Sequence, residues 1–376
     1  MKILLLYVSS VSGHRRAAEA IEQALERLFP QIKVRKEDLF KHGNPLARKI
    51  LDDLYYAAIK VTPWFWDFLW NSNLIFWLTY GLREFSCLLN SFRLYKEVIV
   101  PFNPQVIICT HGLPLALCST IKRRRKLDYL LAAVPTDYSL HPYWTYNNVD
   151  LYFLAHEGMK DSLRKKGISQ AKIQVCGIPI SPIFSEDTDE EELKNKWQIR
   201  HDLFTILLMG GSQGMGPLRR TVDALNGLGL PVQLLIVTGT NDGLKKELQE
   251  IESELSIPSK ILGYTKKIDE LMEISDLLMS KPGGLTITEA LAKDLPLGIL
   301  DCLAGQERKN REFLLQKKIA FNLQREKEIV SLIQRFLDGS FDFEKWQARA
   351  RELVKPKAAL DIAKRVVEVA NERFGC

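Results

Sequence analysis

Residues 3–14 read ILLLYVSSVSGH, and residues 204–214 read FTILLMGGSQG. Each stretch is an apolar run that predicts a buried strand, and each run ends in a turn of glycine and serine. After the first turn, residues 17–28 read AAEAIEQALERL, which predicts a helix. A strand that leads through a glycine turn into a helix is typical of nucleotide-binding α/β units, because glycines let backbone N–H groups approach a phosphate. Two such stretches predict two doubly wound domains.

Length and composition agree with two domains. The chain has 376 residues, of which 46% are hydrophobic and 26% charged, enough for two substantial cores. A net charge of +6 suits an anionic partner such as a phosphate-bearing substrate or an acidic membrane, and we expect no nucleic acid. The six cysteines form no C-x-x-C pair, so we expect reduced thiols in a cytoplasmic protein. The first residues predict a strand and not a signal peptide.

Further apolar runs at 104–112, 126–137 and 149–158 predict more strands of the first domain. Pro179 and Pro182 then lead into an acidic stretch, which we interpret as the linker between domains at 1–185 and 186–376. The second domain repeats the alternation of strands and helices. A last helix at about 358–374 either completes the second domain or packs back on the first. The basic run KRRRK at 122–126 is typical of a solvated helix end, with an anionic-lipid contact as the alternative.

Residues 55–95 form an unusually aromatic insertion. Their longest uncharged run, 68–82, is shorter than the ~20 apolar residues that a membrane-spanning helix needs. One interpretation is a surface that lies in the membrane interface, with Trp64, Trp66 and Trp70 among the lipid-facing residues and basic residues on the flanks. The other is a pair of aromatic core helices. The residue pattern favours neither.

Residues 281–310, KPGGLTITEALAKDLPLGILDCLAGQERKN, contain the sharpest motif. Pro-Gly-Gly between a strand and a helix leaves backbone N–H groups open to a diphosphate. We place Glu289 in the first turn of that helix, where the helix dipole would stabilise a carboxylate that binds ribose hydroxyls. Downstream, the adjacent amide and carboxylate of Gln306 and Glu307 offer the mixed donors and acceptors that hold a sugar.

These motifs, taken in order, resemble the lipid-directed members of glycosyltransferase family 28. The resemblance rests on S-x-x-x-GH at the start, VPTDYSLHPYW at 134–144, GIPISPIF at 177–184, GGSQG at 210–214 and the 281–310 motif. It is strongest toward the bacterial processive diacylglycerol β-glucosyltransferases and then the monogalactosyldiacylglycerol synthases. In one place the chain departs from the family pattern, because Val11 stands where a loop glycine is usual.

The resemblance implies a GT-B fold, in which two Rossmann-like doubly wound domains face a central cleft. It implies an inverting enzyme that needs no metal and no cofactor, with the UDP-sugar as a co-substrate. His14 would be the general base or the group that orients the acceptor hydroxyl, with Asp137 as a second catalytic candidate. His141 and Trp144 would lie on the acceptor side. The donor would be bound by residues of three loops and the helices that follow them: Gly211, Ser212, Gln213, Gly283, Gly284, Leu285, Thr286, Glu289, Gln306 and Glu307.

The predicted function is transfer of a hexose from UDP-glucose or UDP-galactose to the 3-hydroxyl of 1,2-diacylglycerol. The product is a β-glycosyl diacylglycerol, made by a peripheral enzyme on the anionic cytoplasmic face of the cell membrane. Two alternatives remain open. One is an N-acetylglucosamine transferase that acts on an undecaprenyl-linked acceptor in peptidoglycan assembly, and the other is a regulator that binds a nucleotide sugar without transferring it. The sequence does not choose between glucose and galactose and does not predict processivity or oligomeric state.

Overall fold

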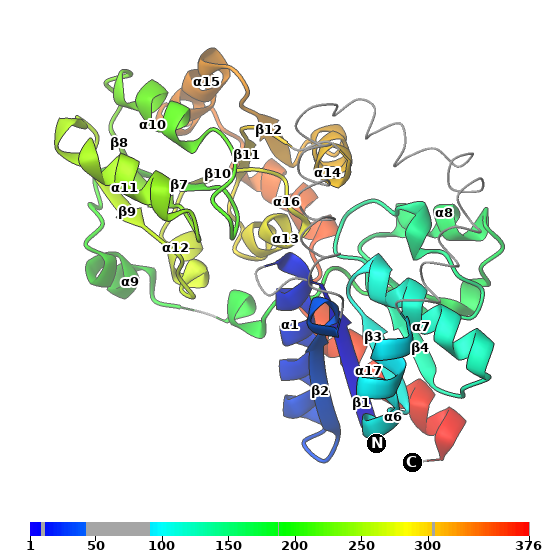
Figure 1. The fold of residues 1–376 in the computed structure, drawn as a ribbon. Helices are drawn as coiled ribbons and strands as arrows, with labels where there is room; N and C mark the ends of the chain where they lie inside the picture. The colour runs from blue at the N-terminus through cyan, green and yellow to red at the C-terminus, as the bar shows by residue number, and fades with distance from the viewer. Residues whose placement is uncertain (9–11, 43–90, 187, 303–304, 376) are drawn as a thin grey trace. The chain divides into compact units, whose positions relative to one another are not determined.

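The computed structural model describes residues 1–376 apart from 9–11, 43–90, 187, 303–304 and 376 (Figure 1). The chain divides into two compact units. Unit 1 comprises Met1–Pro182, Leu303–Gln306 and Lys355–Cys376, and unit 2 comprises Ile183–Cys302 and Glu307–Val354. Val11 and the tryptophans at 64, 66 and 70, and with them most of the aromatic insertion, lie outside the described residues.

Unit 1 is built on a six-stranded parallel sheet in the order β2-β1-β3-β4-β5-β6. Its strands are β1 Lys2–Tyr7, β2 Lys33–Asp38, β3 Val106–Cys109, β4 Leu130–Ala133, β5 Leu151–Leu154 and β6 Ile173–Val175. The central strands are buried along their whole length, as expected for a parallel sheet that helices cover on both faces. In the register, Ile3 of β1 lies opposite Val106 of β3.

In unit 1, helices α1 and α7 begin just after the carboxyl ends of β1 and β3. The helices of this unit are α1 Gly13–Leu28, α6 Val100–Phe102, α7 Gly112–Arg125, α8 Lys160–Arg164 and α17 Ala358–Phe374, with short 3₁₀ turns and one π-helical turn between elements. Helix α1 begins at Gly13, four residues before the predicted stretch 17–28, because the hydroxyl of Ser12 accepts the N–H of Arg15 as an N-cap.

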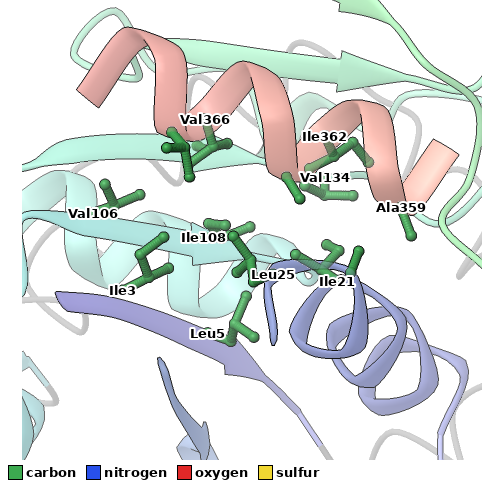
Figure 2. Close-up of a cluster of buried hydrophobic side chains, with 14 of the residues drawn as sticks. Ile3, Leu5, Ile21, Leu25, Val106, Ile108, Val134, Ala359, Ile362 and Val366 are labelled. Carbon is green, nitrogen blue, oxygen red and sulfur yellow. The ribbon is translucent and has the colours of Figure 1, made fainter. Parts of the chain in front are cut away.

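The C-terminal helix α17 packs on α1 and completes the core of unit 1 (Figure 1, Figure 2). Ile362 and Val366 of α17 are fully buried together with Ile21 and Leu25 of α1 and with side chains of the sheet. Of the two placements open to this helix on sequence grounds, the structure therefore has the second, in which the last helix packs back on the first part of the chain.

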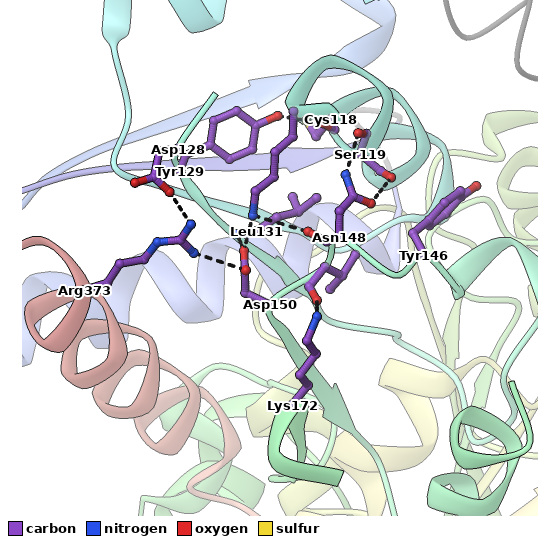
Figure 3. Close-up of polar contacts among 12 residues, drawn as sticks. Cys118, Ser119, Asp128, Tyr129, Leu131, Tyr146, Asn148, Asp150, Lys172 and Arg373 are labelled. Carbon is purple, nitrogen blue, oxygen red and sulfur yellow. Dashed lines mark hydrogen bonds and ion pairs between the residues drawn. The ribbon is translucent and has the colours of Figure 1, made fainter. Parts of the chain in front are cut away.

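Polar contacts fasten the end of α17 to the same sheet (Figure 3). Arg373 forms ion pairs with Asp128 and Asp150, the latter at 3.1 Å between Nη1 and Oδ1. The second carboxylate oxygen of Asp150 accepts the N–H of Leu131 at 2.7 Å and also pairs with Lys122. Lys122, the first residue of the KRRRK run, therefore has a structural role in this network.

The rest of that basic run ends α7, and Arg124, Arg125 and Lys126 are exposed. Since α7 starts at the carboxyl end of β3 and has 14 residues, its last turn lies roughly 20 Å from its start. The position is that of a solvated helix end, where basic side chains complement the helix dipole.

Unit 2 has a second six-stranded parallel sheet in the order β12-β11-β10-β7-β8-β9. Its strands are β7 Phe204–Met209, β8 Val232–Val237, β9 Ser259–Leu262, β10 Leu277–Ser280, β11 Leu297–Ile299 and β12 Ala320–Asn322. Its helices are α9 Glu190–Trp197, α10 Leu218–Asn226, α11 Asp242–Glu250, α12 Ile268–Glu273, α13 Gly284–Ala292, α14 Gln306–Gln316, α15 Glu326–Leu337 and α16 Phe343–Leu353. The predicted pair of doubly wound α/β sheets is confirmed.

The acidic stretch that the sequence suggests as a plain linker is partly helical. Asp189 caps α9 by accepting the N–H of Glu192 at 3.1 Å, and acidic residues fill the first turn, where the helix dipole favours them. Unit 2 begins at Ile183, just before this helix.

Candidate active site

Each sheet has one point where the strand order reverses, and the candidate site residues lie there. In unit 1 this point is between β1 and β3, and in unit 2 it is between β7 and β10. In open parallel sheets, ligands bind in the crevice outside the carboxyl ends of the strands at this switch point. Each switch point, with the residues around it, is called a half-site.

In unit 1, His14 is the second residue of α1 and is fixed by residues that follow the neighbouring strands. Its Nδ1 lies 2.9 Å from the carbonyl oxygen of Thr110, after β3, and 2.8 Å from the hydroxyl of Thr136, after β4. In return, the hydroxyl of Thr110 donates to the carbonyl oxygen of His14 at 2.8 Å. These contacts hold both the ring and the backbone of the histidine.

The contacts assign the tautomer of His14. A carbonyl oxygen accepts and never donates, so the bond to Thr110 requires the proton on Nδ1 and leaves the lone pair on Nε2. Burial lowers the pKa of His14 from 6.5 to about 4, and the bond to Thr110 offsets part of this shift. The half-buried imidazole is therefore neutral at physiological pH and offers Nε2 as a proton acceptor.

A second imidazole, that of His111, packs edge-on against His14, with ring centroids 4.6 Å apart and planes at 85°. His111 caps α7, because its Nδ1 accepts the N–H of Leu113 at 3.0 Å. Burial and the neighbouring His14 hold its pKa well below the usual value. The sequence marks His111 only as a histidine at a strand end, and the structure adds its contact with His14.

Asp137, His141 and Trp144 follow Thr136 along the same edge of the sheet. Asp137 is half-buried. His141 is buried and caps the 3₁₀ turn Pro142–Trp144 by accepting the N–H of Tyr143 at 3.2 Å. Trp144 is also buried, so its indole packs inside the unit as part of this turn. A role of these three residues in catalysis or acceptor binding stays a prediction.

In unit 2, the loop after β7 is shaped by glycines. Gly211 and Gly214 have φ values of +69° and +60°, and a Cβ on Gly214 would lie 2.0 Å from the carbonyl oxygen of Thr238. The N–H of Thr240 fixes the loop by donating to the carbonyl oxygen of Ser212 at 2.9 Å. Ser212 and its neighbour Gln213 are half-buried within this rigid turn.

The second loop of this half-site follows β10 and leads into α13. The N-cap of α13 is Gly283, and among the described residues no side chain caps the helix there, which leaves its first N–H groups for an anion. Asn310 of α14 is fully buried and supports the loop by donating to the carbonyl oxygen of Pro282 at 3.0 Å.

The helix α13 corrects one expectation. It begins at Gly284, so Thr286 lies in its first turn and Glu289 lies in its second turn, not in the first as predicted. Because the dipole effect fades beyond the first turn, it does not stabilise Glu289 as predicted. Glu289 is 1% exposed, and Leu285 is buried as well.

Gln306 and Glu307 begin the helix α14 and do not form a loop. Glu307 pairs with Lys281, the first residue after β10, with 2.9 Å between its Oε1 and the ammonium Nζ. The first turn of α14 is thus connected to the loop after β10. The sequence did not predict a role for Lys281, nor did it predict that Thr110 and Thr136 hold His14 and that Asn310 holds the loop after β10. For Lys281 and Asn310, the one feature of the sequence that indicates a role is their place in the 281–310 motif.

Two family models match the chain. Residues 14–180 match the monogalactosyldiacylglycerol (MGDG) synthase family, and residues 205–366 match the glycosyltransferase family 28 C-terminal domain. Both candidate half-sites lie within the matched ranges or directly beside them.

Known proteins similar to the chain agree with these matches. It is 29% identical to a processive diacylglycerol beta-glucosyltransferase of Bacillus licheniformis, over 89% of this chain and 86% of the relative. It is 26% identical to the chloroplastic monogalactosyldiacylglycerol synthase 2 of Arabidopsis thaliana, over 99% and 81%. The crystal structure of MurG from Acinetobacter baumannii superposes with a TM-score of 0.65 at 14% identity, over 98% and 99% of the two chains. The fold is thus GT-B.

Proposed function

We propose that the chain is a glycosyltransferase of family 28 that transfers a hexose from a UDP-sugar to the 3-hydroxyl of 1,2-diacylglycerol, in agreement with the two family models that match it. The observation that carries the proposal is the neutral His14, whose Nδ1 is bonded to the Thr110 carbonyl and whose Nε2 keeps a lone pair. The relatives named for diacylglycerol glucosylation and galactolipid synthesis support the acceptor.

In the proposed reaction the acceptor hydroxyl attacks C1 of the hexose from the face opposite the diphosphate. Its proton passes to Nε2 of His14 while the bond from C1 to the phosphate oxygen breaks and UDP leaves. A single displacement inverts the anomeric carbon, so an α-linked donor gives a β-glycoside. The bond from Nδ1–H to the Thr110 carbonyl stabilises the imidazolium as it forms.

Most of the residues that would bind the donor belong to unit 2. The glycine loop at 210–214 and the uncapped start of α13 present backbone N–H groups to the diphosphate, which stabilises the leaving group without a metal. Glu289 would accept hydrogen bonds from the ribose, and Gln306 with Glu307 would hold the hexose hydroxyls. Glucose and galactose differ in one hydroxyl orientation, so this last contact would select between them.

The acceptor is a membrane lipid, so we propose that the enzyme binds the anionic cytoplasmic face of the membrane. None of the helices in the described ranges is both long and apolar enough to span a bilayer. At the described end of the aromatic insertion, Phe92 and Val100 are 54% and 51% exposed and lie on one helix face with the exposed Lys96. Exposed apolar and basic side chains on one face suit a lipid interface.

Incubation with vesicles of phosphatidylglycerol and 1,2-diacylglycerol and with radiolabelled UDP-glucose or UDP-galactose tests the proposal. We expect label in the organic extract, as a product in which a β-linked hexose is attached to diacylglycerol. Label that enters lipid only from UDP-N-acetylglucosamine with an undecaprenyl-linked acceptor would replace the proposal with the peptidoglycan reaction. UDP-sugar binding without any labelled lipid would make the protein a nucleotide-sugar sensor.

A further inference from the structure

Lys281 stands at the switch point of the second sheet, as the first residue after β10. We propose that it is a positioning residue of the donor site, where it orients Glu307 and supplies positive charge beside the diphosphate. The inference rests on the proposed function and deepens it. The lysine opens the 281–310 motif, but the predicted donor residues do not include it.

The first observation is the contact with Glu307. The two side chains are only 21% and 16% exposed, with 2.9 Å between Nζ and Oε1. A partly buried pair loses much of its water, so its partners hold each other in place more firmly than an exposed pair does. Because Glu307 is the second residue of α14, this contact fixes the direction from which the helix presents its carboxylate to a sugar.

The second observation places the lysine against the glycine loop. A Cβ on Gly211 would lie 3.0 Å from Cε of Lys281 and 3.9 Å from its Nζ. The glycine at this position therefore leaves the space through which the lysine side chain passes. The ammonium lies between the loop after β7, which is proposed to hold the diphosphate, and the start of α14, which is proposed to hold the hexose.

The donor half-site also needs a positive charge to balance its negative charges. A nucleoside diphosphate brings negative charge into a half-site that already contains the carboxylate of Glu307. Without a cation between them, the carboxylate would repel the ligand, and the repulsion would increase as the departing UDP gains charge. An ammonium at the position of Lys281 offsets both charges, as a metal ion does in other transferases.

The test compares Lys281→Met with Lys281→Arg, using UDP and uridine as probes in titration calorimetry. Methionine keeps the length of the side chain and removes the charge, whereas arginine keeps the charge. We expect Lys281→Met to weaken UDP binding roughly 10- to 100-fold, the loss of one or two charge-assisted contacts, and to change uridine binding less than about threefold. Lys281→Arg should retain most of the affinity for UDP.

A double-mutant comparison tests whether Lys281 acts through its contact with Glu307. If the pair positions the carboxylate, the effects of Lys281→Met and Glu307→Gln on the KM for the UDP-sugar should be smaller together than the product of the single effects. Equal losses for UDP and uridine, or UDP binding unchanged in Lys281→Met, would overturn the inference. Measurements on the wild-type protein distinguish failure of this inference from failure of the proposed function. If the wild type binds UDP but forms no glycolipid, the proposed transfer is refuted and the role of Lys281 in UDP binding stands. If the wild type binds no UDP, both are refuted.

Discussion

Both units are built on six parallel strands and place their candidate residues at the switch point of the strand order, yet the strand orders differ and so do the side chains. At the switch point of unit 1, an imidazole is held by two threonines and a second imidazole, and burial keeps it neutral. At that of unit 2, glycine turns, an uncapped helix start and a lysine–glutamate pair surround the loops. The topology fixes where a ligand binds, and the residues decide whether the place accepts a proton or an anion.

The largest expected effect concerns the base in unit 1. His14→Ala should lower kcat by roughly 10²- to 10⁴-fold, the usual loss when a positioned general base is removed, because the acceptor hydroxyl then keeps its proton. Steady-state rates on diacylglycerol vesicles at saturating UDP-sugar measure this. Turnover close to wild type would make His14 a structural residue and leave Asp137 as the next candidate base.

The second prediction separates the units by stability. Ile362→Ala removes a fully buried side chain of α17 from the core of unit 1 and should cost about 2–5 kcal/mol of its unfolding free energy. Hydrogen exchange should accelerate in peptides that cover β1 and β3, while those that cover β7 and β10 keep their protection. Leu337→Ala, at a residue that is 40% exposed in unit 2, is the matched control. Equal loss of protection in both sheets would show that α17 supports both units.

The third prediction concerns the donor half-site. Glu289→Gln keeps the size of the buried side chain and removes its charge, so it should weaken UDP-sugar binding by about 1.5–3 kcal/mol, the net value of hydrogen bonds to a charged acceptor. Calorimetry with UDP-glucose and UDP-galactose measures the change, and thermal unfolding checks the fold. Donor affinity equal to wild type would remove Glu289 from the site.

The smallest expected effect is a flat pH profile. Burial lowers the folded pKa of His14 to about 4, so the proton-accepting form persists as the pH falls from 8 to about 5.5 and is lost only as the pH passes through about 4. The contribution of His14 to kcat/KM should therefore change less than about twofold across the upper range. If kcat/KM shows an inflection near pH 6.5 and His14→Ala abolishes it, the imidazole of His14 is solvated and not buried.

The sequence predicts well the features that depend on residues close together in the chain, and poorly those that depend on residues far apart. The strands, the glycine loops and His14 belong to short local patterns, and the structure has them where the pattern places them. The supports of His14 come from Thr110 and Thr136, which are 96 and 122 residues away, and only the order of strands brings them together. The turn of α13 that contains Glu289 is not predicted correctly, because the pattern Pro-Gly-Gly is typical of an open loop, whereas the helix begins at the second glycine, Gly284.

The central claim is that unit 1 supplies the base and unit 2 binds the donor. Its most direct test measures UDP affinity and glycolipid formation on the same preparations of His14→Ala and Glu289→Gln. The account predicts that His14→Ala binds UDP like the wild type and makes almost no β-hexosyl diacylglycerol at any donor concentration. Glu289→Gln should bind UDP weakly and recover much of its turnover when the donor is raised to saturation. Loss of UDP binding in His14→Ala, with turnover restored by excess donor, would contradict the assignment of the base to unit 1 and the donor to unit 2.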